Sequence, residues 1–398
     1  MAQVSGIRTS YSGASYSVNP LVPQKRAIAD FIDMIDPRDV PLLKYLGISD
    51  KGAGGVNKAS KFRLLNWPQT QYQWLNDTLA PLTTLLSADA TVATATAAAT
   101  QTVLMYDATS IRTGDVIHID GELIHINSFV PSTKTATWSR FYGGTNHTGS
   151  NVLATDAAVE IISRARVEGA DSDTDYTTQV ADEYNYTQIF QAEIKVSRSQ
   201  NKLDQLGMSS EYDYQVRKKF QEQLRLLEKT LFRGYRNAGS ATLARSMGGF
   251  KQFITDNTAS LASAPLTQKD LEDKIQACWE DGGMPDLIIC NAWAKRKISS
   301  FYAGSVRTTR TENTGGVVID NIETEFGTLG MLMSRWCPST EIFIVTSEYL
   351  GVLPFDAFFD EPLAKDGDYE KGQIVGEYGF VVKNDKAHAM LTTISTTS

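Results

Sequence analysis

Hydrophobic residues recur at helical spacing between residues 209 and 239, the most regular stretch of the chain. Successive members are separated by steps of four, four, four, three, four and four residues. At about 100° per residue they fall within an arc of roughly 140°, which is one face of an amphipathic helix. The predicted helix covers residues 209–238, and its apolar stripe consists of Tyr212, Val216, Phe220, Leu224, Leu227, Leu231 and Tyr235.

The ends of this segment carry helix signals. Ser209 or Ser210 can cap the first turn, and Gly239 can end the helix. At 1.5 Å per residue the helix would be on the order of 40 Å long, more than twice the average length in globular proteins. The segment has seven Lys or Arg against four Asp or Glu. A solvated face or weak contact with a polyanion would explain that excess.

The chain before this helix is mostly polar and extended. Residues 1–25 are rich in Ser, Tyr, Thr and Gly and indicate an extended arm. A short amphipathic helix is predicted at about 27–35, ended by Asp36 and Pro37. A polar strand is predicted at about 61–74.

Residues 82–160 have a different pattern, because Thr, Ala, Val and Gly dominate and helical periodicity disappears. The stretch GDVIHIDGELIHIN predicts a β-hairpin that turns at Asp120-Gly121. Pairing across that turn places four isoleucines on one face and two histidines, His118 and His125, on the other. The isoleucines are Ile117, Ile119, Ile124 and Ile126. The segment is predicted to be a small all-β module inserted between two strands.

The C-terminal half mixes both periodicities. A helix face is predicted from Leu271, Ile275, Cys278 and Trp279, followed by a buried strand at 286–290. Further strands are predicted up to the C-terminus. The predicted fold class is therefore α+β, with the β insertion segregated from the rest.

Composition narrows the functional classes. Thirty-eight basic and 46 acidic residues give a net charge of −8, which argues against a surface built to hold nucleic acid or anionic lipid. No signal peptide and no apolar run of about 20 residues is expected. The three cysteines, Cys278, Cys290 and Cys337, are far apart and are predicted to be reduced core thiols.

One acidic run fits a calcium loop in part. Asp171, Asp173, Asp175 and Asp182 occupy ligand positions one, three, five and twelve of such a loop. Tyr176 stands where the loop needs glycine for its turn, and no helix is predicted on either side. A solvated acidic loop is therefore favoured over calcium binding, and the four aspartates stay weak metal candidates.

Other chemistry is not indicated. The face that carries His118 and His125 offers only Val116 and Leu123 besides, so surface histidines are favoured over a metal site. The sequence contains no P-loop, nucleophile elbow, HExxH pair or cysteine–histidine constellation. No catalytic residue and no cofactor are predicted, and the chain is predicted to be a structural protein rather than an enzyme.

The order of these parts resembles the major capsid proteins of tailed bacteriophages, which have the Hong Kong 97 fold, also called the Johnson fold. IADFIDMIDPRDVPLLKYLG is similar to the arm of phage head proteins, with Val40 where the family usually has Thr. ETEFGTLGMLMSRWCPSTEIFIVTSEYLGV resembles the paired strands of the axial (A) domain. DEPLAKDGDYEKGQIVGEYGFVVKNDKAHAMLTTIS resembles the return through the peripheral (P) domain and the final A-domain strand.

The resemblance implies that the long helix is the spine of the P-domain and that the inserted module interrupts an extended E-loop. The implied divisions are an N-terminal arm (1–46), the first E-loop strand (47–81), the inserted all-β domain (82–160), the E-loop return (161–183), the P-domain with spine helix 209–238 (184–240), the A-domain (241–348), P-domain return strands (349–384) and a C-terminal A-domain strand (385–398). Some family members cross-link an E-loop lysine to a neighbour, but nothing singles out Lys58 or Lys61 as reactive.

The resemblance also implies a function. The protein is expected to assemble in the host bacterial cytoplasm as hexamers and pentamers of an icosahedral shell around double-stranded DNA, and to belong to the virion. Scaffold, portal and decoration proteins are the implied partners, and no membrane is. An encapsulin-like protein compartment is the alternative, followed by a tail or baseplate component.

Overall fold

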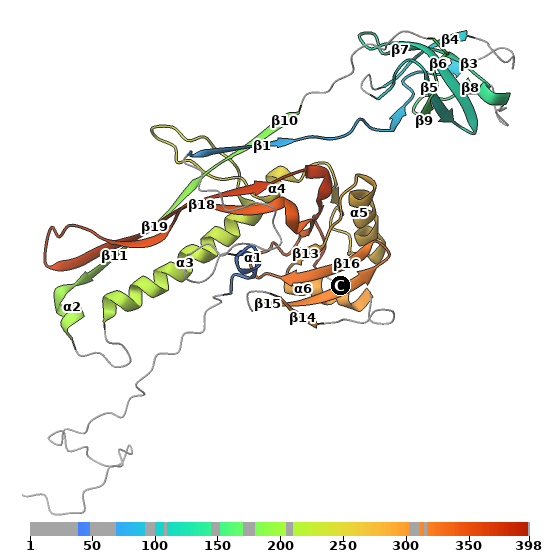
Figure 1. Cartoon of the computed structure of the whole chain (residues 1–398). Helices are drawn as coiled ribbons and strands as arrows, with labels where there is room; N and C mark the ends of the chain where they lie inside the picture. Colours follow the sequence, from blue (N-terminus) through green and yellow to red (C-terminus); the bar gives the residue numbers. More distant parts are fainter. Residues whose placement is uncertain are drawn as a thin grey trace, which may run out of the picture. The chain divides into compact units, whose positions relative to one another are not determined.

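The computed structural model describes residues 39–47, 69–91, 100–106, 110–144, 152–169, 180–203, 210–301, 310–313 and 317–396. The chain forms two compact units (Figure 1). The first unit comprises Met1–Tyr72 and Tyr184–Ser398, and the second comprises Gln73–Glu183. The chain leaves the first unit through β1 (Gln71–Asn76) and returns through β10 (Ala181–Tyr186), and these strands pair in a two-stranded sheet.

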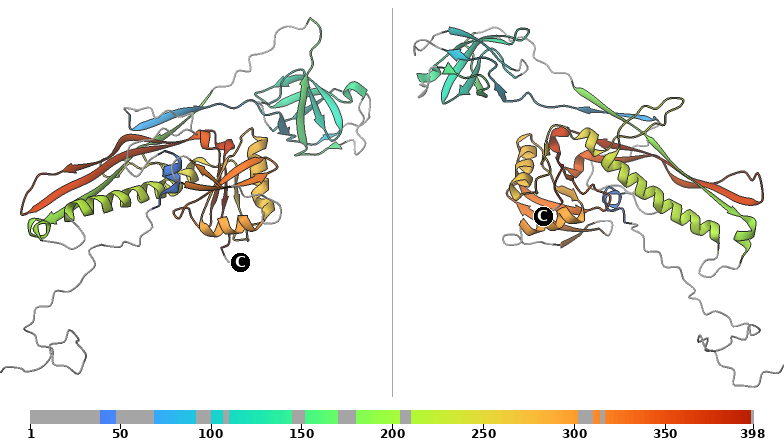
Figure 2. Two further views of the ribbon diagram at one scale, coloured as in Figure 1. Left: turned by 60° about the horizontal axis from the view of Figure 1, so that its bottom comes forward. Right: turned by 180° about the vertical axis from the view of Figure 1, so that it is seen from behind.

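A long helix and a three-stranded antiparallel sheet form one part of the first unit. The sheet has the order β11 (Gln188–Ser197), β19 (Tyr369–Val382), β18 (Leu350–Pro362). The short helix α2 (Arg198–Lys202) follows β11, and α3 (Glu211–Arg233) then runs along the sheet (Figure 2). The α+β class predicted from the sequence is confirmed.

The buried face of α3 agrees in its centre with the predicted stripe. Leu224, Leu227 and Leu231 are buried, and the remaining helical members of the stripe, Tyr212, Val216 and Phe220, are half-buried. Phe220 packs edge-on against Phe358 of β18, with ring centroids 5.7 Å apart. Phe232, which the stripe did not include, is fully buried.

The predicted helix is too long at its C-terminal end. α3 ends at Arg233, where the backbone of Gly234 becomes extended. A Cβ on Gly234 would lie 2.5 Å from the carbonyl oxygen of Met247, so only glycine permits this approach of the two segments. Tyr235 therefore lies outside the helix with 59% of its surface exposed, and its assignment to the stripe is wrong.

A seven-stranded mixed sheet forms the other part of the first unit. Its order is β12 (Thr258–Ser260), β20 (Ala389–Thr392), β17 (Ile342–Val345), β13 (Leu287–Cys290), β16 (Gly327–Met333), β15 (Val317–Thr324), β14 (Arg310–Asn313). The predicted buried strand is β13, which pairs parallel to β16 and antiparallel to β17. The helices α5 (Gln268–Glu280) and α6 (Ala292–Phe301) contribute to its core.

Helix α5 begins with a capping box in which Thr267 and Asp270 satisfy each other's backbone N–H groups. Leu271, Ile275 and Cys278 are buried as predicted. Trp279 is 53% exposed, so the predicted face is one residue too wide.

The first unit also contains two short helices. α1 (Pro41–Tyr45) buries Leu42 and Leu43 completely. α4 (Phe250–Phe253) follows the turn after α3 and buries Phe250. The described residues contain no helix that is both long and apolar enough to cross a bilayer.

The described part of the second unit consists of strands and one 3-10 turn. Its six-stranded sheet has the order β2 (Thr83–Leu85), β9 (Ala158–Arg164), β5 (Asp115–Ile119), β6 (Glu122–Val130), β7 (Thr135–Ser139), β4 (Thr100–Leu104). A smaller pair joins β3 (Ala90–Thr91) and β8 (Val152–Leu153). The predicted hairpin is confirmed, since β5 and β6 turn at Asp120 and Gly121, both with positive φ.

The isoleucine face of that hairpin lies in a separate core. Ile117, Ile119, Ile124 and Ile126 are all 0% exposed and pack with Trp138 and other apolar residues of the same unit. A buried ion pair accompanies this core, because the Arg140 guanidinium donates to the Glu122 carboxylate at 2.6 Å and both side chains are fully buried. The segment 82–160 lies within the second unit, and its boundary at 160 falls inside β9.

Substitution of Leu227 by Asp is expected to abolish folding of the first unit, because it would place an unpaired carboxylate in the middle of the buried face of α3, at a cost of several kcal/mol. Lys229→Asp is the matched control, since Lys229 is exposed on the same helix. Soluble yield and thermal unfolding measure both changes. Equal losses in the two variants would show that the buried face has been misassigned.

Replacement of residues 82–166 by a short Gly/Ser linker is expected to leave the first unit folded. The second unit has its own core, and loop closure depends only weakly on loop length. Circular dichroism and calorimetry of the shortened chain should retain the signal of α3 and a cooperative transition. An insoluble or non-cooperative product would mean that the two cores are interdependent.

Candidate functional site

The acidic run offers no metal site in the described residues. Asp171, Asp173 and Asp175 lie outside the described ranges, and Asp182 is an exposed residue of β10. Within the described ranges no group of three or more His, Cys, Asp or Glu side chains is arranged to hold a metal ion. The weak calcium candidates therefore stay a prediction, because three of the four aspartates lie outside the residues that the structure describes.

The two histidines of the hairpin have different neighbours. The Nδ1 atom of His118 lies 3.9 Å from the Glu160 carboxylate. His125 stacks on Tyr142 with ring centroids 5.3 Å apart, and its Nδ1 lies 3.0 Å from Asn127 Oδ1. The contacts of each histidine are those of a partly exposed sheet surface.

The three cysteines are free and buried, as predicted. Burial raises the pKa of the Cys278 and Cys290 thiols to about 12, and it also raises that of Cys337. A thiol must lose its proton to act as a nucleophile or a metal ligand. These side chains therefore act as core residues.

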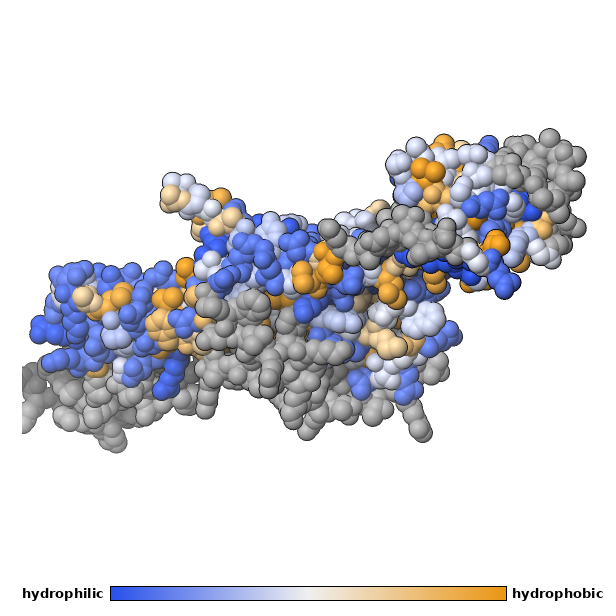
Figure 3. Space-filling view, turned by 45° about the horizontal axis from the view of Figure 1, so that its top comes forward, coloured by the Kyte–Doolittle hydropathy of each residue, from blue (hydrophilic) through white to orange (hydrophobic). Residues whose placement is uncertain are grey.

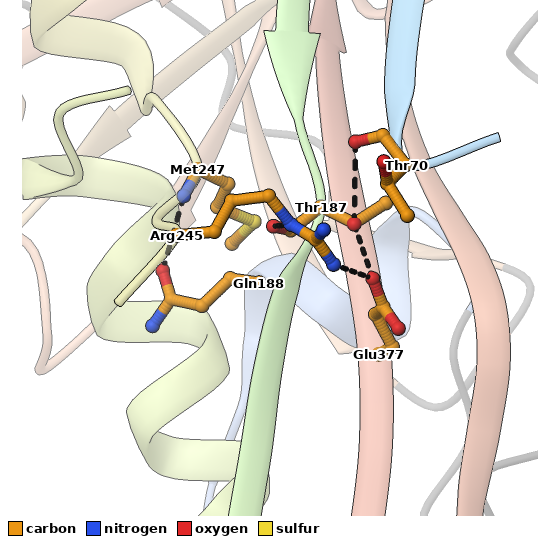
Figure 4. Close-up of polar contacts among 6 residues, drawn as sticks. All are labelled: Thr70, Thr187, Gln188, Arg245, Met247 and Glu377. Carbon is orange, nitrogen blue, oxygen red and sulfur yellow. Dashed lines mark hydrogen bonds and ion pairs between the residues drawn. The ribbon is translucent and has the colours of Figure 1, made fainter. Parts of the chain in front are cut away.

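A polar cluster of the first unit lies where the chain leaves for β1 and re-enters after β10 (Figure 4). The backbone N–H of Thr187 donates to the Thr70 carbonyl at 2.9 Å. The Thr187 hydroxyl contacts both that carbonyl and the Glu377 carboxylate. A hydroxyl can donate only one hydrogen bond. The Thr187 hydroxyl donates it to the Glu377 carboxylate, which is a stronger acceptor than the carbonyl.

Arg245 completes this group, which we call the Thr187 cluster (Thr70, Thr187, Arg245 and Glu377). Its Nε donates to the Thr187 carbonyl at 2.8 Å, and its Nη2 pairs with the Glu377 carboxylate. Beside it, the Met247 backbone N–H donates to Gln188 Oε1 at 3.2 Å (Figure 4). The cluster therefore attaches the segment that carries Thr70 and the segment that carries Thr187 to Glu377 of β19.

Close packing of Tyr72 on β19 also holds the start of β1. Tyr72 is 2% exposed, and a Cβ on Gly379 would lie 2.1 Å from its ring atom Cε2. Glycine in β19 thus leaves the space that the Tyr72 ring fills. Burial raises the pKa of the Tyr72 hydroxyl well above its usual range, so this residue stays uncharged.

A buried carboxylate joins three separate segments of the first unit. Glu228 of α3 is 0% exposed. Its Oε1 accepts a hydrogen bond from Ser334 Oγ at 2.6 Å, and its Oε2 accepts one from the backbone N–H of Leu43 in α1 at 3.5 Å. Burial raises the pKa of Glu228 to about 7, and these hydrogen bonds only partly offset that effect.

The residues around α1 add surface contacts to this attachment. Trp336 Nε1 donates to the Asp39 carbonyl at 2.9 Å. The Arg335 guanidinium pairs with the Asp39 carboxylate at 3.0 Å. The segment that the sequence related to the arm of phage head proteins is therefore held at its C-terminal end.

A buried histidine lies elsewhere in the same unit. His388 is 0% exposed. The Thr346 backbone N–H donates to its Nδ1 at 3.2 Å, and its Nε2 lies 3.0 Å from the Lys383 carbonyl. These contacts suit the neutral ring protonated at Nε2, and burial lowers the pKa of His388 to about 4.

Sequence reasoning missed Glu228, the Thr187 cluster and His388. For Glu228 a signal existed, because it stands four residues after Leu224 and three before Leu231, on the buried face of the helix. No local pattern marks the Thr187 cluster, whose members come from four separate segments. In the described residues these polar groups join segments of the fold, and none forms a nucleophile–base pair.

Comparison with known proteins gives the chain's relatives. Residues 7–395 match the family model of the SU10 major capsid protein. The major capsid protein of Escherichia phage Phieco32 is 25% identical over 296 residues, covering 60% of this chain and 84% of that protein.

Solved structures are more distant. The holo-SrpI encapsulin complex of Synechococcus elongatus has a TM-score of 0.43 at 13% identity, covering 56% of this chain and 79% of that chain. A structure from Mycobacterium phage Bobi has a TM-score of 0.41 at 13% identity, covering 58% and 80%.

Opposite pH dependences are expected from the two buried titratable groups. The pKa of Glu228 is raised from 4.5 to about 7, so its contribution to stability is full below pH 4.5 and is lost as pH rises through 7. The pKa of His388 is lowered from 6.5 to about 4, so its contribution is full above pH 6.5 and is lost as pH falls through 4. Each is worth about 3 kcal/mol, and within this window they oppose each other.

Glu228→Gln should therefore lose stability relative to the wild type as pH falls from 7 to 4, and His388→Gln should show the reverse. Chemical unfolding at several pH values measures the difference. Glu361→Gln, at an exposed position, is the control and should follow the wild type. Parallel curves for all four proteins would contradict the assignment.

Glu377→Ala is expected to lower stability by about 1–3 kcal/mol, because it leaves the Arg245 guanidinium without its carboxylate. Amide hydrogen exchange at Thr187 should become faster. Glu361→Ala is the matched control, since it removes a single exposed contact with Gln373. Similar exchange at Thr187 in both variants would show that the cluster does not hold this segment.

Proposed function

The chain belongs to the SU10 major capsid protein family, and from this membership we propose that it assembles with copies of itself into the icosahedral shell that encloses the double-stranded DNA of a tailed phage. The observation that carries the proposal is the match of the family model over residues 7–395. The family is a structural one and not an enzyme class. The protein is therefore a phage major capsid protein, and in this proposal it acts through contacts between subunits.

The parts of the chain suit the Hong Kong 97-type arrangement. In this proposal α3 is the spine helix and the sheet of β11, β19 and β18 completes the P-domain. The seven-stranded sheet with α5 and α6 is the A-domain. β1, β10 and the second unit form the E-loop with its insertion. The Thr187 cluster then holds the root of the E-loop, which is where a load on the loop would reach the P-domain.

Exposed apolar side chains supply contact surface for neighbouring copies. In the first unit Met284 is 76% exposed and Trp279 is 53% exposed. In the second unit Leu79 is 95% exposed and Val167 is 79% exposed. On the face that Figure 3 shows, hydrophobic residues form small patches amid hydrophilic surface.

The net charge of −8 suits a container for DNA. Each Lys or Arg that neutralises a phosphate strengthens binding in a sequence-independent way, so a strongly basic wall would hold the packaged genome and oppose its release. Hexamers and pentamers of this chain, with scaffold, portal and decoration proteins, are the proposed partners. Assembly in the host bacterial cytoplasm is part of the same proposal.

Expression of the protein, alone or with a scaffold protein, is expected to yield capsomers or closed shells. Size-exclusion chromatography with light scattering gives the mass, and negative-stain electron microscopy gives the shape. Met284→Glu should weaken assembly without lowering the melting temperature of the subunit, because Met284 is exposed. A compact monomer at high concentration as the sole species would contradict the proposal.

A further inference from the structure

An apolar groove of 580 Å³ lies beside α3 in the first unit. Val216, Phe220 and Leu224 of α3 form one wall, and Phe358 of β18 with Ile374 of β19 forms the other. The volume is in the range of sites that hold a small ligand or several side chains. Because Val216 and Phe220 are only half-buried, the groove leaves apolar surface of the spine helix uncovered.

The lining of the groove includes residues at the start of α1. Asp39 and Lys44, on either side of the start of α1, both line it. Thirty-eight residues of the same chain precede Asp39. Ile35 is four residues away, a reach of at most about 14 Å for an extended chain. A tethered segment of this length is present at the groove at a millimolar effective concentration.

The sequence just before Asp39 has the composition that such a groove requires. Ile28, Phe31, Ile32 and Ile35 recur at steps of three, one and three residues, which is the spacing of one helix face. Asp30 falls on the opposite side of that pattern. An amphipathic segment of about ten residues is too short to be stable as a helix alone, so its apolar face needs a surface to cover.

We propose that the groove between α3 and the sheet of β18 and β19 is the binding site for residues 27–36 of the same chain, whose apolar face covers Val216, Phe220 and Phe358. Two charged residues also line the groove. Arg217 is exposed and offers a counter-charge to Asp33 or Asp36, but an exposed ion pair adds little. Asp360 disfavours an acidic side chain beside it.

This docking goes beyond shell assembly and does not depend on it, since the groove and the segment belong to one subunit. The docked N-terminal segment and α3 share a core within the single subunit, without any contact from a neighbouring copy. The attachment of α1 through Leu42, Leu43 and Glu228 then continues upstream along the same helix.

The test is a disulfide within the full chain, made on unassembled subunits at low concentration. Phe31→Cys and Ile35→Cys are each combined with Gln221→Cys, which lines the groove. The natural cysteines are buried and stay unreactive. Mild oxidation followed by peptide mapping is expected to find the intrachain link in most molecules for at least one of the two pairs. The control pair, Ile35→Cys with Lys269→Cys on the exposed start of α5, should give less than a tenth of that yield.

Two outcomes would overturn the proposal. A yield at the control level for both pairs would show that the segment does not occupy the groove. A link found only between chains would assign the groove to a second copy. Neither outcome touches the proposed shell function, which is measured by particle formation of the wild-type chain.

A second measurement does not require a new covalent bond. Phe31→Asp should release the segment and speed amide exchange several-fold in peptides that cover Val216 to Leu224, with α5 unchanged. Tyr16→Asp, further from the groove in the chain, is the matched control and should leave exchange at α3 as in the wild type. Equal exchange in the two variants would contradict the docking.

Discussion

The burial of α3 is the constraint on which the first unit depends. Its N-terminal half packs along the three-stranded sheet, and its C-terminal half enters an aromatic cluster. Within that cluster the ring centroid of Phe232 in α3 lies 5.7 Å from that of Phe343 in β17. The ring centroid of Phe250 in α4 lies 5.4 Å from that of Phe343 and 5.0 Å from that of Phe380 in β19. One helix therefore packs against residues of two sheets that differ in topology.

Glu228 gives this core a polar centre at the attachment of α1. Burying a carboxylate is costly unless hydrogen bonds replace its hydration. The bond from Ser334 at 2.6 Å is short, whereas that from Leu43 at 3.5 Å is weak. The attachment of α1 therefore rests mainly on its two fully buried leucines. The carboxylate orients the helix between α3 and the segment that carries Ser334, and its raised pKa is the consequence of that position.

The connection to the second unit is built differently. Its root depends on the Thr187 cluster and on Tyr72 against Gly379, a mixture of directional hydrogen bonds and close packing. The second unit then has its own core, with the buried Glu122–Arg140 pair among its strands. The first and second units are therefore stabilised by different sets of buried residues.

The sequence by itself determined the elements whose information is local. The spacing of Leu224, Leu227 and Leu231 specified α3, and Asp120-Gly121 with its flanking isoleucines specified the hairpin of β5 and β6, because each depends on residues a few positions apart. The end of α3 at Gly234 and the hydrogen-bond partner of Glu228 were decided only by the tertiary structure. Both depend on Met247 and Ser334, partners that lie 13 and 106 positions further along the chain. Hydrophobic periodicity states which residues avoid water, and it carries no information about which distant segment covers them.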